Sequence, residues 1–397
     1  MTEPTYLFYD IESTGLNKCF DQIIQFAAIR TDMSLNILDK TDITVKLRPD
    51  IIPAPGAVIT HRIGVSAMQK GLEESEAIQA IHDLMNTPMT VSVGYNTLGF
   101  DDEFLRFSFY RNLLSPYTHQ YANQCARMDI YPMAAMYYLF NQDLLNWPVA
   151  ENKTSLKLEN IAKINQLSSG RAHHAMTDVI ATLNLAKKMK QDDRMWAYLV
   201  GSFNKKTDLS RHYGRNEAIL VSGRIGANYN FHAPALNLGQ HNHYKNQTVW
   251  LRLDTEALQN STPSDFKDTT RIIKRRAGEA PLLLPLNSRF KEQMSAERIE
   301  MAEKNLDWLR NQEVLLEVLS DFYRNETYPI VEGLDPDASL YSVGFSNSYE
   351  VRLFKKFNAA SPRDKLSIAN QIPNETRRLQ AYRLLARMHP AETPEKI

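Results

Sequence analysis

The 397-residue sequence predicts an α/β domain followed by a smaller β region and a helical C-terminal region. Runs of aromatic and β-branched residues in the first third, helical and strand periods that alternate after them, and a change of texture after residue 194 predict this order. At roughly 150 residues per domain, the length allows two or three domains. With 43% hydrophobic residues and with Gly and Pro spread along the chain, the composition excludes collagen-like and wholly disordered classes.

Short apolar runs in the first third predict three antiparallel strands, because the links between the runs are short. These runs are Tyr6 to Tyr9, Ile23 to Thr31 and Ile43 to Leu47. Further along, periodicity predicts a helix over residues 73–85, a strand over 90–94, a helix near 101–112 and a helix over 175–190. Antiparallel strands first and βα alternation afterwards are typical of an α/β sheet of the ribonuclease H type.

The rest of the chain predicts short strands and then helices. β-like runs, separated by Asn, Gly, His and Pro, occur at residues 218–222, 248–253 and 282–286. From residue 295 to 326 the apolar spacing returns to a helical period, and prolines divide the tail into short helices. We therefore expect three segments: an α/β domain at residues 1–194, a β domain with flanking helices at 195–345, and a helical region at 346–397.

The charge balance and the cysteine content limit which binding partners and which cellular compartment we expect. Forty-six Lys and Arg residues balance 46 Asp and Glu residues, so a polyanion would need a local basic surface. Residues 346–397 have ten basic and five acidic side chains, a net charge of +5 that leaves −5 for residues 1–345. Two cysteines without a CxxC spacing argue against a disulfide scaffold or a structural zinc site. With no signal-peptide pattern and no long apolar stretch, we expect a cytoplasmic protein without a membrane span.

Asp10 and Glu12 lie at the end of the first predicted strand. Side chains two apart on a strand point to the same face, so two carboxylates meet there. Such a like-charged pair requires a cation, and hard oxygen ligands suit Mg²⁺ or Mn²⁺. Taken by itself, however, an Asp-x-Glu after a strand is more often a solvated turn.

Two further segments place polar groups at the start of predicted helices. In the first, Asp101 and Asp102 follow Phe100, and either aspartate could simply serve as the helix N-cap. In the second, His173 stands five residues before Asp178, and an isolated His is usually a surface or core residue. Each segment is weak evidence alone.

Together the three segments resemble the DEDD exonuclease superfamily. Asp-x-Glu, then Asn-x3-Phe-Asp, then His-x-Ala-x2-Asp occur here in the order of that superfamily and on the expected elements. The resemblance implies that four carboxylates hold two divalent ions and that a histidine, which marks the histidine subclass, completes the site. His174 falls one place off the spacing, and Asp102 is set aside because the superfamily's carboxylate directly follows the Phe. The five implied catalytic residues are Asp10, Glu12, Asp101, His173 and Asp178.

The chemistry of phosphodiester hydrolysis explains this set of residues. The reaction needs a water made nucleophilic and a leaving alkoxide stabilised, and two metal ions about 3.5–4 Å apart do both. A histidine with an ordinary pKa of about 6.5 takes the proton of that water at neutral pH. We expect two Mg²⁺ ions as cofactors, for which Mn²⁺ can substitute.

Longer stretches resemble the bacterial exonuclease I family in particular. The resemblance is strong over residues 5–190, patchy over 195–345 and weak in the basic tail. It implies a ribonuclease H-like exonuclease domain, an SH3-like β domain and a helical domain, which agrees with the three expected segments. The family's helical domain runs on for several dozen residues beyond this chain, so the chain is either truncated or a shorter member. The stretches are Gln25 to Asp32, Pro55 to Val58, Gly94 to Asn96, Phe100 to Glu103, Phe109 to Asn112 and Asn146 to Pro148.

The resemblance implies a processive 3′ to 5′ exodeoxyribonuclease that degrades single-stranded DNA to 5′-mononucleotides. It also implies a monomer that binds the C-terminal tail of single-stranded DNA-binding protein. Two alternatives stay open. One is a DEDD exonuclease of another substrate class, such as a proofreading or short-RNA enzyme, and the other is an inactive single-stranded nucleic-acid-binding scaffold.

Substrate contacts are expected in two parts of the chain. By resemblance, Thr14 contacts the 3′ end, Leu16 forms a wedge beside the terminal base and Arg106 contacts a phosphate. Asn96, which belongs to the second motif, is also expected to bind the substrate. A groove for a single strand also needs cations and aromatic rings for stacking, although a charge run is more often a solvated face. The β region offers Arg271, Lys274, Arg275, Arg276, Tyr229, Phe231 and Tyr244.

Overall fold

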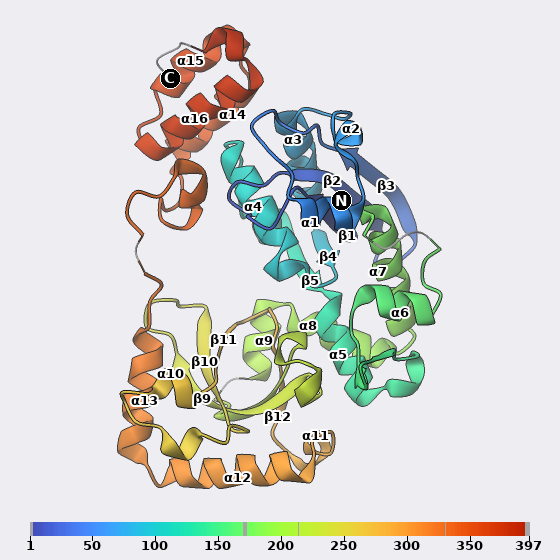
Figure 1. The fold of residues 1–397 in the computed structure, drawn as a ribbon, viewed down its shortest axis with the longest axis vertical. Helices are drawn as coiled ribbons and strands as arrows, with labels where there is room; N and C mark the ends of the chain where they lie inside the picture. Colours follow the sequence, from blue (N-terminus) through green and yellow to red (C-terminus); the bar gives the residue numbers. More distant parts are fainter. Residues whose placement is uncertain (1–2, 170–172, 213, 330, 394–397) are drawn as a thin grey trace. The chain divides into compact units, whose positions relative to one another are not determined.

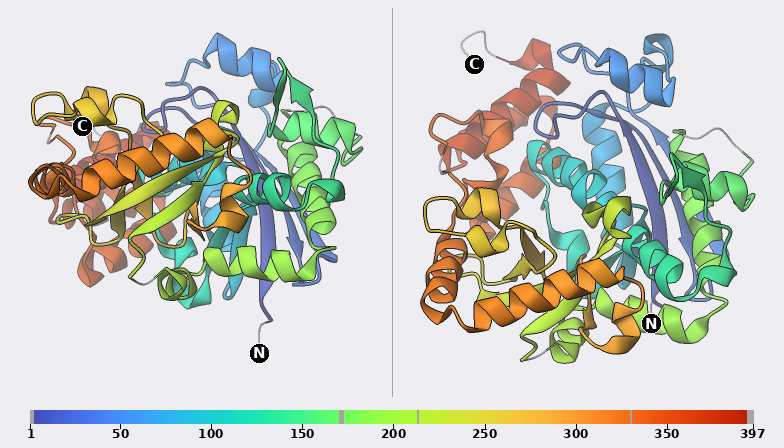
Figure 2. Two further views of the ribbon diagram at one scale, coloured as in Figure 1. Left: turned by 90° about the horizontal axis from the view of Figure 1, so that it is seen from below. Right: turned by 60° about the horizontal axis from the view of Figure 1, so that its bottom comes forward.

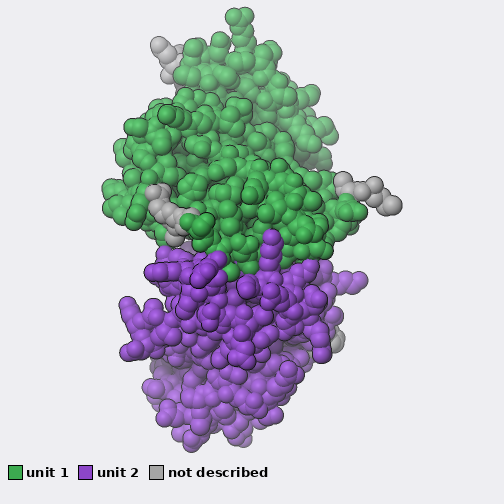
Figure 3. Space-filling view, turned by 90° about the vertical axis from the view of Figure 1, so that its right-hand side faces the viewer, with its two compact units in different colours: residues 1–129, 167–184, 330–397 green, residues 130–166, 185–329 purple. Residues whose placement is uncertain are grey.

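The computed structural model describes residues 3–169, 173–212, 214–329 and 331–393. By contacts between residues, the chain divides into two compact units (Figure 3). Unit 1 comprises residues 1–129, 167–184 and 330–397, and unit 2 comprises residues 130–166 and 185–329. The expected segments 1–194, 195–345 and 346–397 follow the texture of the sequence, and as functional domains they stay a prediction.

Unit 1 is built on a five-stranded mixed sheet with the strand order β3-β2-β1-β4-β5 (Figure 1). Antiparallel pairing joins β1, β2 and β3, whereas parallel pairing joins β1 to β4 and β4 to β5. This arrangement confirms the predicted α/β sheet. The strands are β1 (Thr5–Ser13), β2 (Ile23–Thr31), β3 (Ile37–Thr44), β4 (Thr90–Gly94) and β5 (Ala126–Asp129).

The third strand lies earlier in the chain than the sequence predicts. The expected strand, Ile43 to Leu47, overlaps β3 only at its end, because β3 stops at Thr44. β3 is an edge strand with mostly exposed side chains, so it lacks the apolar pattern that would reveal it. The apolar run instead leaves the sheet, and Leu47 packs in a small separate cluster.

Helices α3 (Glu74–Met85) and α4 (Asp101–Arg111) pack against one face of this sheet (Figure 1). Because side chains alternate along a strand, Asp10 and Glu12 point to the opposite face, where α7 (Ala175–Met189) supplies Asp178. All three helices confirm the predicted spans within one residue at each end. The buried cluster under α3 and α4 includes Leu7, Tyr9, Ile11, Phe26, Ile78, Ile81, Phe104 and Phe109.

The tail of the chain also belongs to unit 1 and forms the short helices that the sequence predicts. These helices pack around an apolar cluster that includes Leu113, just beyond α4. Several arginines of the basic tail are bound in ion pairs. Arg377 pairs with Glu350 at 2.7 Å, and Arg383 pairs with Asp335 at 2.6 Å. The helices of unit 1 not yet named are α1 (Pro55–His61), α2 (Val65–Met68), α14 (Ser348–Ala359), α15 (Pro362–Asn370) and α16 (Glu375–Met388).

Unit 2 contains a second five-stranded sheet, which is antiparallel throughout and has the strand order β11-β10-β9-β8-β12. Helices α12 (Ala296–Arg310) and α13 (Glu313–Asn325) pack on it around a cluster that includes Leu251 and Leu306 (Figure 2). Both features confirm the predicted β region and the helical period after it. The strands are β8 (Glu217–Val221), β9 (His232–Gln240), β10 (Gln247–Arg252), β11 (Ile272–Arg276) and β12 (Leu282–Pro285).

Shorter elements complete unit 2. A two-stranded sheet pairs β6 (Val149–Ala150) with β7 (Lys153–Thr154). Among the described residues of the whole chain, no helix has both the length and the apolar character that a membrane crossing requires. Cys19 and Cys125, which both belong to unit 1, are free thiols. The other helices of unit 2 are α5 (Ile130–Phe140), α6 (Leu158–Ile164), α8 (Asp193–Ser202), α9 (Lys205–Arg211), α10 (Phe266–Thr269) and α11 (Ser288–Lys291).

A buried carboxylate at the start of α3, Glu74, joins two arginines from different parts of unit 1. Arg48 donates a hydrogen bond to it at 2.7 Å, and Arg111 at the end of α4 donates one at 3.2 Å. All three side chains are buried. Burial alone would raise the pKa of Glu74, but the positive charges of Arg111 and Arg48 lower it to about 2. The negative charge of Glu74 therefore stabilises the folded state.

We expect Glu74→Gln to lower the free energy of unfolding by about 3 kcal/mol at pH 7, because two buried guanidinium groups lose a counter-charge. The folded pKa lies below the ordinary value of 4.5, so this contribution is complete above pH 4.5 and is lost as the pH falls toward 2. Urea unfolding of both proteins at pH 7 and at about pH 3 measures the effect. If the unfolding free energies of the two proteins differed as much at about pH 3 as at pH 7, Glu74 would not act as a charged partner of the arginines.

Candidate active site

Two of the predicted catalytic carboxylates come from β1. Asp10 and Glu12 are half-buried and lie two residues apart on one face of the strand. β1 runs parallel to β4, so the carboxyl ends of both strands lie at the same edge of the sheet. The pairing of β1 with β2 shifts register between Glu12 and Ser13. The end of the strand therefore delivers both carboxylates to this edge.

The third carboxylate, Asp101, is the first residue of α4. Its Oδ1 accepts a hydrogen bond from the backbone N–H of Ile11 at 3.3 Å. Because Ile11 stands between Asp10 and Glu12, this bond places Asp101 beside the β1 pair. The alternative role of an N-cap is wrong, since Phe100 occupies that position and no side-chain hydrogen bond caps the helix.

The fourth carboxylate, Asp178, lies in the first turn of α7. One oxygen from each of Asp10, Glu12 and Asp178 lies within 4.8 Å of the others. Asp178 Oδ2 also accepts a hydrogen bond from the backbone N–H of His173 at 3.1 Å. His173 is exposed and has a left-handed backbone with φ of 59°. All five predicted catalytic residues therefore lie in one part of unit 1.

Burial and like charges raise the pKa values of two of these carboxyl groups, Asp10 and Asp101. For Asp10 the causes are burial and the neighbouring charges of Asp101, Asp178 and Glu12. For Asp101, burial together with the charges of Asp129 and Glu12 outweighs its backbone hydrogen bonds and raises the pKa to about 8. A divalent cation would replace this repulsion with attraction. Carboxylate oxygens gathered at one edge of a sheet fit such an ion.

Asp129, the last residue of β5, is a site residue that sequence reasoning missed. It is buried, and its Oδ1 accepts a hydrogen bond from the N–H of Asn96 at 2.7 Å. Its charge also raises the pKa of Asp101. β5 reads Ala-Arg-Met-Asp and lacks the β-branched and aromatic residues that predict a strand. The one available signal was an aspartate close to a strand end, which is too common to single out.

Asp102, which the spacing sets aside, has a separate structural role. It is buried, and it pairs with Arg106 at 2.8 Å, with His119 at 3.1 Å and with Arg127. Although burial opposes ionisation, the charge of Arg127 and the contact with His119 lower the pKa of Asp102. Its carboxylate is thus used in ion pairs within the protein. Setting it aside as a metal ligand agrees with these contacts.

The four expected substrate contacts differ in accessibility. Leu16 is 84% exposed, and Asn96 is also exposed. Thr14 is buried, and its hydroxyl donates to Asp21 at 3.0 Å. Arg106 is buried and paired with the carboxylates of its own helix, so a contact with phosphate would require these pairs to open. The roles of all four in substrate binding stay predictions.

In unit 2 two of the predicted groove residues are buried. Arg275 is wrong as a groove cation, because it pairs with the buried Asp208 at 2.6 Å. Phe231 is also buried and is wrong as a stacking platform. Arg271 is exposed, and its guanidinium lies 5.4 Å from the ring centroid of Tyr229. The candidates with exposed or half-buried side chains are Arg271, Lys274, Arg276, Tyr229 and Tyr244.

The raised pKa of Asp101 leads to a prediction about proton release. With a pKa of about 8, this carboxyl group holds a proton at pH 7 without a cation and loses it when a cation binds. Titration calorimetry with saturating Mn²⁺ at pH 7, in buffers with different heats of ionisation, measures the protons released. We expect Asp101→Asn to release about one proton fewer per molecule than the unaltered protein. Equal release from both would show that Asp101 is ionised before the cation binds.

Comparisons with known proteins agree with this geometry. Residues 7–186 match the RNase T family of exonucleases. Exodeoxyribonuclease I of Buchnera aphidicola subsp. Acyrthosiphon pisum is 30% identical over 337 residues, which cover 79% of this chain and 82% of that protein. Exodeoxyribonuclease I of Escherichia coli (strain K12) is 30% identical over 378 residues, which cover 87% of this chain and 78% of that protein.

Solved structures of exonuclease I have a similar fold. The E. coli enzyme in complex with a dA16 oligonucleotide has a TM-score of 0.87 and 25% identity, covering 99% of this chain and 89% of that one. The zinc-bound E. coli complex with single-stranded DNA has a TM-score of 0.88 and 25% identity, covering 99% and 88%. A complex of SSB and exonuclease I with an inhibitor has a TM-score of 0.87 and 25% identity, covering 100% and 88%.

Proposed function

Because this chain belongs to the exodeoxyribonuclease I family, we propose that it removes 5′-mononucleotides processively from the 3′ end of single-stranded DNA. The observation that carries the proposal is the meeting of Asp10, Glu12 and Asp178, whose oxygens lie within 4.8 Å of one another. The choice of substrate is supported by the similar E. coli structure, which holds a dA16 oligonucleotide.

The two alternative functions have less support. The relatives named exodeoxyribonuclease I match over 337 and 378 residues, well beyond the exonuclease region at residues 7–186. A proofreading or short-RNA enzyme would not need to resemble these relatives outside the exonuclease region. An inactive scaffold would gain nothing from four neighbouring carboxylates, because their repulsion destabilises the folded state unless a cation is bound.

The residues of the site have different tasks in phosphodiester hydrolysis. Asp10, Glu12, Asp101 and Asp178 would hold two divalent ions, which we propose are Mg²⁺, with Mn²⁺ as a substitute. When bound, these ions activate the attacking water and stabilise the leaving alkoxide. His173, exposed beside Asp178, takes the proton of the attacking water on a ring nitrogen.

A protein partner is part of the same proposal. The similar solved complex of SSB and exonuclease I supports binding of single-stranded DNA-binding protein. We propose that this protein binds through its C-terminal tail. We further propose that the enzyme acts in the cytoplasm as a monomer.

The function is tested with 3′-labelled single-stranded DNA, the matching duplex and RNA of the same sequence, each incubated with protein and Mg²⁺. We expect rapid release of labelled mononucleotide from single-stranded DNA alone. Excess unlabelled DNA, added after the reaction starts, then tests processivity, since a strand that stays bound runs on to short products. Equal degradation of RNA or duplex would favour the other substrate class, and no degradation at all would favour the scaffold.

We expect Asp10→Ala to reduce turnover of single-stranded DNA to below about 1% of the unaltered protein, because a ligand of the divalent ions is lost. DNA binding should persist, since contacts with the strand lie elsewhere, and the fold should be no less stable, since like charges are separated. Turnover assays, DNA-binding titrations and thermal unfolding measure the three properties. Asp39→Ala, on the exposed edge strand β3, is the matched control. A normal rate in Asp10→Ala would refute the metal-ligand assignment.

The two adjacent histidines should behave differently. His173→Ala is expected to lower kcat by about 10², as the loss of a general base does, whereas His174→Ala should change kcat by less than about twofold. Steady-state rates at saturating DNA and Mg²⁺ compare the two variants. Equal losses at both positions would mean that the motif spacing has not identified the base.

A further inference from the structure

Residues 14–21, here called loop 14–21, connect β1 to β2 and directly follow the carboxylates of β1. Leu16 is 84% exposed on this loop. Behind it, Asp21 accepts hydrogen bonds from the hydroxyl of Thr14 at 3.0 Å and from the N–H of Asn17 at 2.7 Å. A Cβ atom on Gly15 would lie 2.4 Å from the carboxylate of Asp21, so the turn has no room for a side chain there. The loop is compact and presents Leu16 outward.

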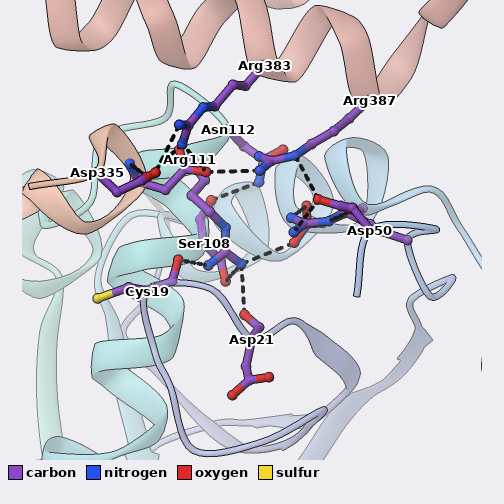
Figure 4. A network of polar contacts seen from close by, with 12 residues as sticks. Cys19, Asp21, Asp50, Ser108, Arg111, Asn112, Asp335, Arg383 and Arg387 are labelled. Atoms are coloured by element: carbon purple, nitrogen blue, oxygen red, sulfur yellow. Dashed lines mark hydrogen bonds and ion pairs between the residues drawn. The ribbon is translucent and has the colours of Figure 1, made fainter. Parts of the chain in front are cut away.

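Arg111, the last residue of α4, holds this loop from inside the protein. Its guanidinium is buried and donates to the backbone carbonyls of Cys19 at 2.8 Å and of Asp21 at 3.1 Å. A longer hydrogen bond reaches the carbonyl of Lys18 at 3.4 Å. Figure 4 shows the Arg111 side chain between α4 and the loop, with Cys19 and Asp21 on the loop side. One side chain therefore fixes three backbone groups of the loop.

The charge of Arg111 is balanced separately from its contacts with the loop. Backbone carbonyls carry no net charge, whereas Glu74, 3.2 Å away, supplies a full negative charge. The two roles can thus be separated by mutation. Removal of the Arg111 and Glu74 charges together leaves this pair neutral but still removes the hydrogen bonds to the loop.

Helix α4 links the loop to the proposed metal ligands. It begins at Asp101 and ends at Arg111, and its eleven residues form a continuous rod about 15 Å long. The same helix therefore sets the position of a carboxylate at one end and of loop 14–21 at the other.

We propose that Arg111 is a positioning residue that fixes loop 14–21 and, through Leu16, the 3′-terminal nucleotide relative to the carboxylates. This inference rests on the proposed function, because it takes the DNA end as the group that Leu16 meets. Arg111 is buried, so it acts through the loop rather than by touching DNA.

The test compares three forms of the full chain: the unaltered protein, Glu74→Gln, and the double variant Arg111→Met with Glu74→Gln. Glu74→Gln keeps the bonds from Arg111 to the loop and is the matched control for stability. Relative to that control, the double variant should lower kcat on single-stranded DNA by about 10- to 100-fold, because a remote change that misplaces reacting groups by about 1 Å costs up to 10². KM for DNA and the Mg²⁺ concentration for half-maximal rate should change by less than about threefold, because the groove and the carboxylates are untouched.

A second readout follows the loop without relying on activity. Hydrogen exchange of the amides of residues 14–22 should be at least about tenfold faster in the double variant than in Glu74→Gln, because the loop loses its anchor. Exchange in β1 and α7 should stay the same. Equal kcat or equal loop exchange in these two variants would overturn the proposal and leave Arg111 with a role in charge balance alone.

Leu16 connects the loop to the DNA. If Arg111 acts through this side chain, Leu16→Ala and the double variant together should lower kcat by less than the product of their separate effects. Independent, multiplicative effects would overturn the link through Leu16. Failure of the proposed function is recognised separately: the unaltered protein would then degrade none of the DNA substrates, while the exchange rates would still report whether Arg111 holds the loop.

Discussion

Mutual repulsion among four carboxylates is the constraint on which the rest of unit 1 depends. These groups come from β1, α4 and α7, which are separated by long stretches of sequence, and the fold must hold them together against their charge. Backbone N–H groups help to do so, since Ile11 donates to Asp101 and His173 donates to Asp178. The apolar cluster between the sheet and helices α3 and α4 stabilises the fold and so offsets the repulsion at this site.

Several buried arginines have a structural role inside the protein. Arg111, Arg275 and Arg377 are buried, and each faces a buried carboxylate from another part of its unit. Each of these arginines therefore joins elements that are distant in sequence. In a chain with equal numbers of acidic and basic residues, such pairing reduces the cations left to contact phosphates. Recognition of a polyanion then depends on the cations that remain exposed, of which Arg271 beside Tyr229 is one.

The sequence was most informative where local pattern and long-range packing agree. The helices at residues 74–85, 101–111 and 175–189 have apolar stripes that face a core, so periodicity located them closely. The catalytic candidates were found because their motifs combine strand ends with helix starts. The resemblance to a known superfamily then assigned these residues to one active site.

The errors have physical causes. β3 is an exposed edge strand without an apolar pattern, and β5 is four residues long without β-branched or aromatic side chains, so both escape a search for β-rich runs. Arg275 and Phe231 are buried against partners far along the chain, Asp208 and Tyr138. The sequence does not show whether a basic or aromatic residue contacts DNA or is buried in a core, because only tertiary contacts distinguish the two cases.

The division of unit 1 has a consequence for its synthesis on the ribosome. Phe107 and Tyr110 of α4 are covered by Leu340, and Leu113 is covered by the tail helices. About 200 residues separate residue 129 from residue 330, so at roughly 5–20 residues per second these side chains wait about 10–40 s for their cover. During that interval the nascent chain displays an aromatic surface on α4 that the finished protein hides. This helix is therefore a site where chaperones that bind exposed apolar segments can act during synthesis.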